Sequence, residues 1–398
     1  MTTDEKFASI VAEATEWRRD FHAHPELSFQ EYRTSAKVAE LLESWGIEVT
    51  RNIAGTGLVG TLRAGKAAEG GNRGKAIGLR ADMDALPMPE MTGLPYASKT
   101  PGVMHACGHD GHTAMLLGAA KYLAETRNFD GTVHFIFQPA EEKGGGGRVM
   151  VEEGLFTRFP CDFVYGIHND SRLTTGHFAI TYGTTNAAAD TFAIRIHGKG
   201  GHAARPHHSI DPVMTAAHVA VALQSVVSRR IDPIESAVLS ICMIHGGTAT
   251  NVIPEEAVLE GTVRTMKAEV RDDMERLLTE VATATAMAHG ARAVVEYERG
   301  YPSVVNSNEP VDRARRAAAA LFGQERVIHD RPPTMGGEDF AYMANTVPGC
   351  FIRLGHVDPG TERFSNHHPR YDFNDASLEP GIRFWAGLVE QELVDEQK

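Results

Sequence analysis

Apolar residues recur along the first half of the chain with two spacings, one typical of helices and one typical of strands. Residues 4–22, 33–45 and 110–125 are predicted to be helices, and in the last two the apolar positions fall on one helical face. Short apolar runs bounded by glycine or proline predict strands at residues 58–62, 76–79, 132–137 and 163–167. Strands that alternate with helices favour an α/β fold, with helices on both sides of a sheet.

The pattern changes near Tyr182. The next elements are predicted in the order strand, helix, strand, strand, helix, strand, which is that of a ferredoxin-like unit. They cover residues 191–197, 211–229, 237–244, 257–264, 267–289 and 292–298. We therefore expect residues 1–183 and 298–398 to form an α/β domain and residues 184–297 to form an inserted α+β domain. A chain of 398 residues is longer than one core usually supports, which agrees with two domains.

Composition narrows the possible partners. The formal net charge of −13 argues against a general affinity for nucleic acids or for anionic membrane surfaces. Four widely spaced cysteines suggest no disulfide framework, which favours a reducing compartment. The N-terminal stretch lacks the apolar core of a signal peptide, and no run of about 18 apolar residues predicts a membrane span. We expect a cytoplasmic protein.

Two aspartates follow the strand predicted at residues 76–79. Asp82 and Asp84 are two residues apart, so on an extended segment their carboxylates share one face. They stand at the carboxyl end of the strand, where open α/β sheets bind their ligands. Two carboxylates this close repel each other unless a cation or a proton lies between them. A solvated turn after the strand is the alternative interpretation.

A loop rich in histidine and cysteine precedes the helix predicted at 110–125. Cys107 and His109 flank a glycine, and thiolate and imidazole are good ligands for zinc-like ions. A lone buried cysteine is usually an apolar filler, but three histidines and a cysteine within eight residues argue against that reading here. His105 and His112 are weaker candidates, and His112 could pack on the helix or support a ligand.

Two glutamates follow the strand predicted at 132–137. Glu141 and Glu142 come after Pro139, in an irregular turn where neighbouring side chains can reach one site. One such carboxylate could hold a metal while the other takes a proton from water. An exposed acidic turn is the alternative.

Histidines complete the set. His168 follows the strand predicted at 163–167, and His367 and His368 lie far along the chain. Each of them alone could be a structural histidine. Because parallel strands bring their carboxyl ends to one edge of a sheet, the aspartates, cysteine, histidines and glutamates together could hold two metal ions.

The inserted domain carries a further group of polar residues. His202 lies in one glycine-rich loop, Asn251 lies in a second, and Arg264 ends a predicted strand. Side chains that donate hydrogen bonds suit a developing oxyanion or a substrate carboxylate. Glycine-rich turns with polar surface residues are the alternative.

Taken together, these stretches resemble the M20 family of metallopeptidases and amidohydrolases, and most closely its branch of hippurate hydrolases and auxin-amino-acid hydrolases. The matching stretches follow the family's order over nearly the whole chain. They are WRRDFHAHPELS (17–28), RADMDALP (80–87), MHACGHDGHT (104–113), QPAEEKGGGG (138–147), GIHN (166–169), residues 198–206 and 246–254, MGGEDF (335–340) and residues 367–374.

The resemblance implies an α/β catalytic domain with a mixed, mostly parallel sheet and two metal ions, and an inserted ferredoxin-like lid domain that also forms a dimer. The metal ligands it implies are Cys107, His109, Glu142, His168 and His367. Asp84 looks like the carboxylate that orients a ligand, and Glu141 looks like the general base. His202 resembles a histidine that reaches the active site of a partner subunit and polarises the scissile carbonyl, and Asn251 and Arg264 look like substrate contacts.

Two details remain open within this resemblance. His367 is preferred over His368 because it stands two residues before Pro369. The branch often continues after His-Asn with Trp-Pro, whereas this chain has Asp170 and then Ser-Arg, which alters a loop beside the site.

The implied reaction is hydrolysis of the amide bond of an N-acyl amino acid to a carboxylic acid and a free amino acid, with two divalent ions (Zn, Mn, Co or Ni). A small-molecule substrate and a homodimer or dimer-based tetramer are expected. Three alternatives compete with it. They are an aminopeptidase or dipeptidase on the same scaffold, a cysteine hydrolase that pairs Cys107 with His109 or His112, and a non-catalytic metal-binding dimer.

Overall fold

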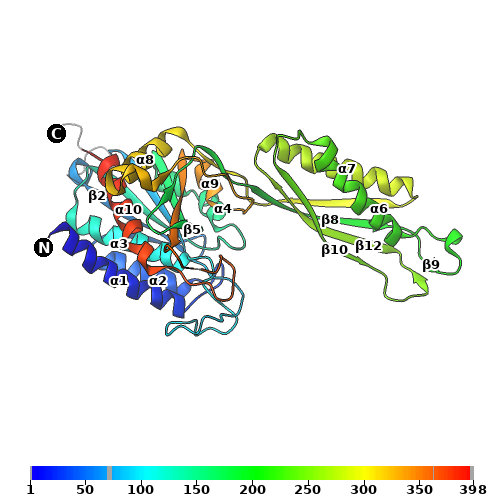
Figure 1. Cartoon of the computed structure of the whole chain (residues 1–398), viewed down its shortest axis with the longest axis horizontal. Coiled ribbons are helices and arrows are strands. Elements are labelled where there is room, and N and C mark those ends of the chain that lie inside the picture. Colours follow the sequence, from blue (N-terminus) through cyan, green and yellow to red (C-terminus); the bar gives the residue numbers. More distant parts are fainter. Residues whose placement is uncertain (1, 70–73, 362, 395–398) are drawn as a thin grey trace. The chain divides into compact units, whose positions relative to one another are not determined.

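The computed structural model describes residues 2–69, 74–361 and 363–394. Its contacts divide the chain into two compact units. The first unit runs to Gly183 and resumes over Val305–Pro332 and from Asp339 onward, and the second comprises Thr184–Val304 and Pro333–Glu338. Sequence analysis placed the second limit at 297/298, so the second unit extends further than expected and also takes in a short later segment. Figure 1 shows both units with their elements labelled.

The first unit contains an 8-stranded sheet in the order β1-β2-β4-β3-β5-β16-β6-β15. The pairs β3–β4, β3–β5, β5–β16 and β6–β15 are parallel, while β1–β2, β2–β4 and β6–β16 are antiparallel. This confirms the predicted mixed, mostly parallel sheet. The strands are β1 (Glu48–Ile53), β2 (Gly57–Ala64), β3 (Ala76–Asp82), β4 (Gly131–Gln138), β5 (Phe163–Thr174), β6 (Phe178–Ala179), β15 (Val327–Ile328) and β16 (Gly349–Val357).

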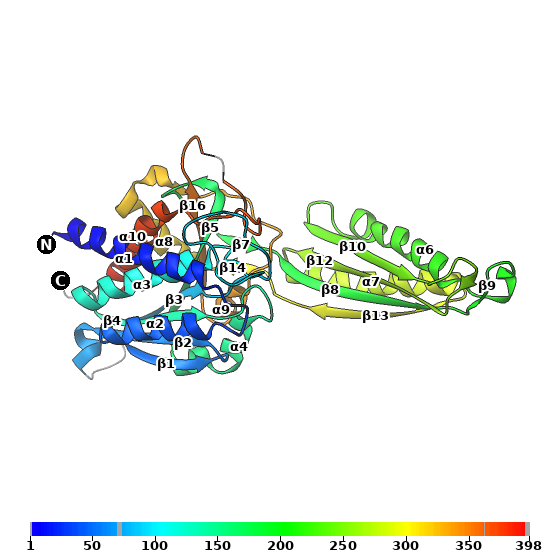
Figure 2. The same ribbon diagram turned by 90° about the horizontal axis from the view of Figure 1, so that it is seen from below.

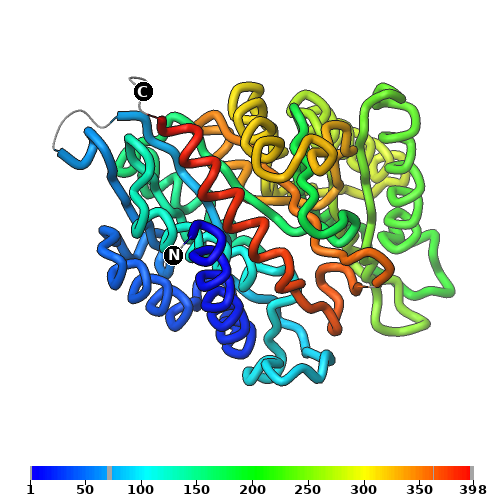
Figure 3. Tube along the Cα trace, turned by 60° about the vertical axis from the view of Figure 1, so that its left-hand side comes forward, coloured from blue at the N-terminus to red at the C-terminus, as the bar shows by residue number. Residues whose placement is uncertain are grey.

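Helices cover both faces of this sheet. On one face α1 (Thr3–Ala23), α3 (His109–Thr126) and α10 (Leu378–Glu392) contact one another (Figure 3) and enclose a single apolar core with the strands. On the other face α9 (Phe340–Ala344) contacts β5 and β16, and the Phe340 and Phe351 rings stack there with centroids 5.4 Å apart. The remaining helices of this unit are α2 (Tyr32–Ser44), α4 (Gly146–Glu152), α5 (Leu155–Arg158) and α8 (Asn308–Phe322).

β5 differs from its predicted extent. The sequence analysis ended this strand at Ile167, but the strand continues through His168 to Thr174. The reason lies in β16, which pairs beside it in parallel and holds the polar residues after His168 in an extended conformation. His168 and Asp170 are therefore two residues apart on one strand and share a face of the sheet.

The second unit is a four-stranded antiparallel sheet in the order β10-β12-β8-β13, with its own apolar core under two helices (Figure 2). Numbered along the chain, the strands run 2-3-1-4 across the sheet, which matches the predicted ferredoxin-like unit. Its main elements are β8 (Ala188–His197), α6 (Pro212–Ser225), β10 (Ala237–Gly246), β12 (Glu256–Thr265), α7 (Ala268–Ala288) and β13 (Arg292–Arg299). The remaining strands are β7 (Gly183–Asn186), β9 (Gly201–His202), β11 (Val252–Ile253) and β14 (Val304–Asn306).

The sequence predicts no membrane-spanning segment. Among the described residues, every helix is too short or too polar to cross a membrane.

Candidate metal centre

Cysteine, histidine and glutamate side chains from four separate segments of the first unit meet at one place. Five groups form, each with its possible ligand atoms within 4.8 Å of one another. Three contain only cysteine, histidine and glutamate, namely Cys107–His109–His168, Cys107–Glu142–His367 and His109–Glu141–Glu142. The other two are Asp82–His109–His112 and Glu141–Glu338–Asp339. The structure thus brings together all five side chains that were predicted as ligands, and with them the predicted base.

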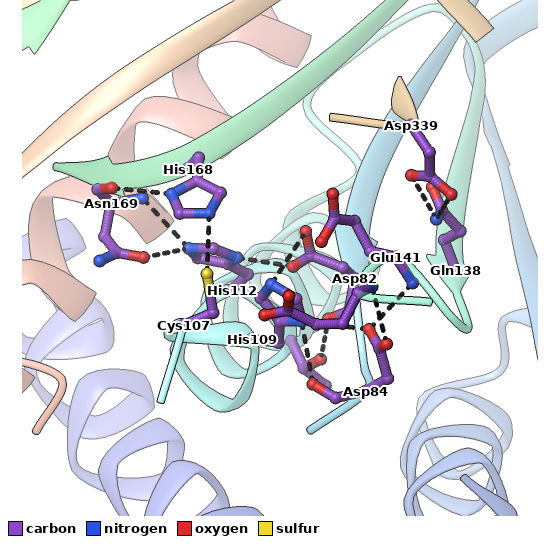
Figure 4. Close-up of polar contacts among 12 residues, drawn as sticks. Asp82, Asp84, Cys107, His109, His112, Gln138, Glu141, His168, Asn169 and Asp339 are labelled. Atoms are coloured by element: carbon purple, nitrogen blue, oxygen red, sulfur yellow. Dashed lines mark hydrogen bonds and ion pairs between the residues drawn. The ribbon is translucent and has the colours of Figure 1, made fainter. Parts of the chain in front are cut away.

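Cys107 is the one cysteine of the five predicted ligands, and like His109 and Glu142 it belongs to two of the three groups without aspartate. Its Sγ atom is 3.4 Å from Nε2 of His168 and 3.5 Å from Nδ2 of Asn366 (Figure 4 labels Cys107 and His168). Burial and the negative charge of Glu142 raise the pKa of the Cys107 thiol far above its usual value. Without a cation beside it, this sulfur therefore stays a thiol rather than a thiolate.

His109 opens α3 and is oriented from behind by Asp84. Its Nδ1 atom is 2.9 Å from the backbone oxygen of Asp84 and 3.2 Å from Oδ1 of the same residue, so Nδ1–H donates to Asp84. This leaves Nε2 for the site, where it is buried and makes no hydrogen bond among the described residues. Burial alone would lower the pKa of His109, but the charge of Asp82 and the hydrogen bond to Asp84 raise it well above its usual value.

Glycine is required just before this histidine. Gly108 has φ +99°, in the left-handed region, and a Cβ atom there would lie 2.4 Å from Oδ1 of Asn169. A side chain at this position would push the Cys107–His109 loop away from β5.

Asp84 also holds the turn that carries the two glutamates. Its Oδ1 accepts from the backbone N–H of Glu141 at 3.1 Å, and its Oδ2 accepts from the N–H of Glu142 at 3.0 Å and from the hydroxyl of Ser28 at 2.7 Å. Burial would raise the pKa of Asp84, but these hydrogen bonds and His109 lower it below its usual value. One buried carboxylate thus orients a predicted ligand and both glutamates.

Asp82 belongs to a different network from Asp84. Its carboxylate accepts from Arg80 at 2.6 Å and from Nδ1 of His112 at 2.6 Å, and it lies 3.7 Å from Nε2 of His109. The other nitrogen of His112 is 2.8 Å from Oδ1 of Asn169, so both of its ring nitrogens are engaged. His112 therefore supports the site rather than offering a free ligand atom.

Sequence analysis missed the buried charges behind Asp82. Arg80 donates to Oε1 of Gln138 at 2.8 Å and to Oδ1 of Asp339 at 3.0 Å. Gln138 donates to Asp339 at 2.8 Å, as Figure 4 shows. These polar side chains are fully buried. Arg80 itself was the signal in the sequence, because it interrupts an apolar run of β3 and a charge is buried in a strand only when it is paired.

The neighbouring histidines His367 and His368 have different surroundings. His367 adopts a left-handed conformation (φ 65°), donates its N–H to Ala106 and places Nε2 3.3 Å from Oε1 of Glu142. His368 is half-buried and stacks on the ring of Phe364, whereas the side chain of His367 is 55% exposed. Of the two, only His367 lies among the grouped side chains in the described part of the chain.

The second unit holds the other three predicted site residues, and it does not bring them all together. β9 pairs with β11, and Ala203 donates its N–H to the backbone oxygen of Asn251 at 3.1 Å, so His202 and Asn251 are neighbours. They adjoin the first residues of β12, whereas Arg264 is the penultimate residue of that strand. At about 3.4 Å per residue, Arg264 lies roughly 25 Å further along the sheet.

Comparison with known proteins agrees with this arrangement. Residues 78–391 match the model of peptidase family M20/M25/M40. The chain is 40% identical to the hippurate hydrolase of Campylobacter jejuni over 94% of both chains, and 42% identical to an N-acetylcysteine deacetylase of Bacillus subtilis over the same shares. It superposes with a TM-score of 0.83 on the Bacillus subtilis YXEP protein, described as a dinuclear metal binding peptidase from the M20 family, at 36% identity over 97% of this chain and 99% of that one.

The chain belongs to the M20 family. Within this M20 fold the donor atoms suit two adjacent divalent cations. Cys107, His109 and Glu142 each belong to two of the three groups without aspartate, so the ligands of the two ions would lie side by side. His109 Nε2 is buried and makes no hydrogen bond among the described residues, and the buried Oε1 of Glu142 lies 3.3 Å from Nε2 of His367, another predicted ligand. This is expected of atoms that hold a cation. Thiolate, imidazole and carboxylate together fit zinc and its first-row neighbours.

The contacts of Asp84 generate a testable prediction. Asp84→Asn replaces one acceptor oxygen by an NH2 group and leaves two buried donors unsatisfied, so metal-free protein should lose about 2–4 kcal/mol of unfolding free energy at neutral pH. Because the folded-state pKa of Asp84 is lowered, its contribution is present above the unfolded value and is lost as the pH falls. The difference between wild type and variant should therefore shrink below about pH 4.

Urea unfolding across this pH range would measure the difference. Asp20→Asn is the matched control, because the Asp20 side chain is 37% exposed and its carboxylate pairs with the partly exposed Arg33 and His24. Its effect should stay within about 1 kcal/mol. Equal stabilities of wild type and the Asp84 variant at pH 7 would contradict the role given to this carboxylate.

Proposed function

We propose that this M20 protein is a metal-dependent amidohydrolase that splits N-acyl amino acids into a carboxylic acid and a free amino acid. The observation that carries the proposal is the convergence of Cys107, Glu142 and His367 on one side and His168 on the other around His109, with Glu141 beside them. Five ligands and a further carboxylate are what a two-metal hydrolase needs.

The related proteins support this substrate class. The two curated relatives are named for hippurate and N-acetylcysteine, and both compounds are amino acids acylated on nitrogen. Because the chain matches each relative over most of its length, the proposal extends to the whole chain. The acyl group and the amino acid are left open between these examples.

In the proposed reaction, Glu141 moves the proton. Two divalent ions held by the five ligands would lower the pKa of water and polarise the amide carbonyl. Glu141 takes a proton from water, and the water oxygen forms a bond to the carbonyl carbon. Glu141 then passes the proton to the amide nitrogen as the C–N bond breaks, which releases the amine. Asp84 accepts a hydrogen bond from the backbone N–H of Glu141. This contact positions Glu141 without involving its carboxylate.

The cysteine hydrolase alternative is disfavoured. A cysteine nucleophile must be a thiolate, and burial together with Glu142 raises the pKa of the Cys107 thiol instead. An activity assay distinguishes the aminopeptidase or dipeptidase alternative, because such an enzyme would cleave unblocked dipeptides faster than N-acylated ones.

We further propose that the second unit forms a homodimer and completes the site. β10 is an edge strand whose Met243 and Ile244 side chains are 46% and 51% exposed, and an unpaired apolar edge favours association. His202 and Asn251 lie far along the sheet from Arg264, so one copy of this unit is not expected to present all three to one small substrate. In this proposal His202 and Asn251 serve the partner's site, where His202 polarises the scissile carbonyl, and Arg264 binds the substrate carboxylate.

Paired variants of the two glutamates test the reaction. Glu141→Gln should retain two ions per chain and lose activity by about 10³–10⁴-fold, because it removes the base but no ligand. Glu142→Gln should lose bound metal. Metal analysis, together with amino acid release from N-benzoyl, N-acetyl and N-indoleacetyl amino acids, provides both readouts, and chelation of wild type should abolish release.

Glu152→Gln is the control, because Glu152 is an exposed residue of α4 paired with Arg148. It should match wild type in metal content and rate. Near-normal turnover by the Glu141 variant would refute the assignment of the base, and no release from any N-acyl substrate would refute the substrate class.

A mixing experiment tests the shared site. Glu141→Gln and His202→Ala homodimers should each be inactive, because each lacks a different part of both sites. Hybrid dimers formed by mixing them should regain activity, since one of their two sites then has an intact Glu141 and an intact His202. Hybrids that are present by mass measurement but remain inactive would show that His202 serves its own chain.

A further inference from the structure

Glu31 is a fully buried carboxylate that the proposed reaction does not use. Its Oε1 accepts from the backbone N–H of Ala140 at 2.9 Å and from that of Phe29 at 3.1 Å. Its Oε2 accepts from the hydroxyl of Thr56 at 2.5 Å. Both oxygens are therefore occupied, and Glu31 belongs to none of the possible metal-holding groups among the described residues.

The partner of Glu31 is the first residue of the glutamate turn. Ala140 has φ 55°, a left-handed conformation that costs a non-glycine residue roughly 1 kcal/mol or more and persists only where neighbours hold it. The next two N–H groups, those of Glu141 and Glu142, donate to Asp84. Three consecutive amides are thus held by two buried carboxylates, and Glu31 holds the strained one.

The residues beside Glu31 contact the same turn. Ser28 donates its hydroxyl to Asp84 at 2.7 Å. The ring of Phe29 packs so closely on Gly144 that a Cβ atom there would lie 2.5 Å from its Cε2 atom. The segment 28–31 therefore touches the turn at Ala140, at Gly144 and through Asp84.

We propose that Glu31 is a positioning residue that aims the Glu141 carboxylate by fixing the backbone of Ala140. This inference rests on the proposed function, because it takes Glu141 as the group that moves the proton. Glu31 touches neither a ligand nor the reacting atoms, so its effect passes through the turn. A misplacement of about 1 Å at such a distance can slow a reaction by roughly 100-fold.

The chain offers a matched control for this residue. Glu26 lies on the same segment and accepts from two backbone N–H groups and a threonine hydroxyl, namely those of Arg33 (3.0 Å) and Thr34 (2.8 and 3.0 Å). These donors belong to the start of α2 rather than to the glutamate turn. Glu31 and Glu26 thus make the same kinds of hydrogen bond at two different places.

Glu31→Met should lower kcat by about 30–100-fold with KM changed less than about 3-fold and two ions still bound per chain. Glu31→Gln should stay within about 3-fold of wild type, because its amide oxygen can still accept from Ala140 and Thr56 can turn to accept from its NH2 group. Glu26→Met should lose stability and keep kcat within about 2-fold. In metal-free protein, amide exchange over residues 139–146 should accelerate in Glu31→Met alone.

Equal kcat values for the Glu31→Met and Glu26→Met proteins would overturn the inference, as would loss of metal from the Glu31 variant. If Glu31→Met does not fold, Glu31→Asp replaces it: the shorter side chain keeps the charge but cannot reach Ala140, and kcat should fall about 10-fold with metal retained. An unchanged Glu31→Asp enzyme would equally overturn it. If Glu141→Gln is inactive while the Glu31 variants are normal, only this inference fails, whereas an active Glu141→Gln enzyme removes the proposed function itself.

Discussion

The arrangement of the candidate metal centre depends on the buried carboxylate of Asp84. A charge is tolerated inside a protein only when its oxygens are filled with hydrogen bonds, and Asp84 fills them with the ring of His109, the amides of Glu141 and Glu142 and the hydroxyl of Ser28. The same requirement that stabilises the charge thus brings together a helix start and a strand-end turn. Glu31 accepts from the preceding amide of the same turn, but there burial outweighs the hydrogen bonds and raises the pKa of Glu31 to about 7.

Much of the fold and of the candidate metal centre could be predicted from the sequence, because both follow from local patterns of residues. Strands end where Asp82 and Gln138 stand, and parallel neighbours bring such ends to one edge, so convergence followed from strand order alone. Cys107 and His109 were identifiable because few structural roles need a thiol and an imidazole around one glycine. The alternation of helices and strands likewise predicted the α/β sheet and the ferredoxin-like insertion.

The rest depended on contacts between distant segments, which a single sequence does not display. β5 continues past His168 because β16, almost 200 residues later, pairs beside it. The sequence did not single out Arg80 or Glu31, and only their burial and contacts show that they support the site. The choice between His367 and His368 rested on spacing, whereas the structure separates them by backbone conformation and by stacking. The separation of Arg264 from His202 follows from strand length and pairing, which motif spacing does not reveal.

The most direct test of the account is anomalous X-ray diffraction from crystals of the purified protein loaded with zinc or manganese. The account predicts two neighbouring peaks, with Cys107, His109, Glu142, His168 and His367 as the protein ligands. Peaks away from these side chains, or a single peak that leaves Cys107 uncoordinated in fully active protein, would contradict it.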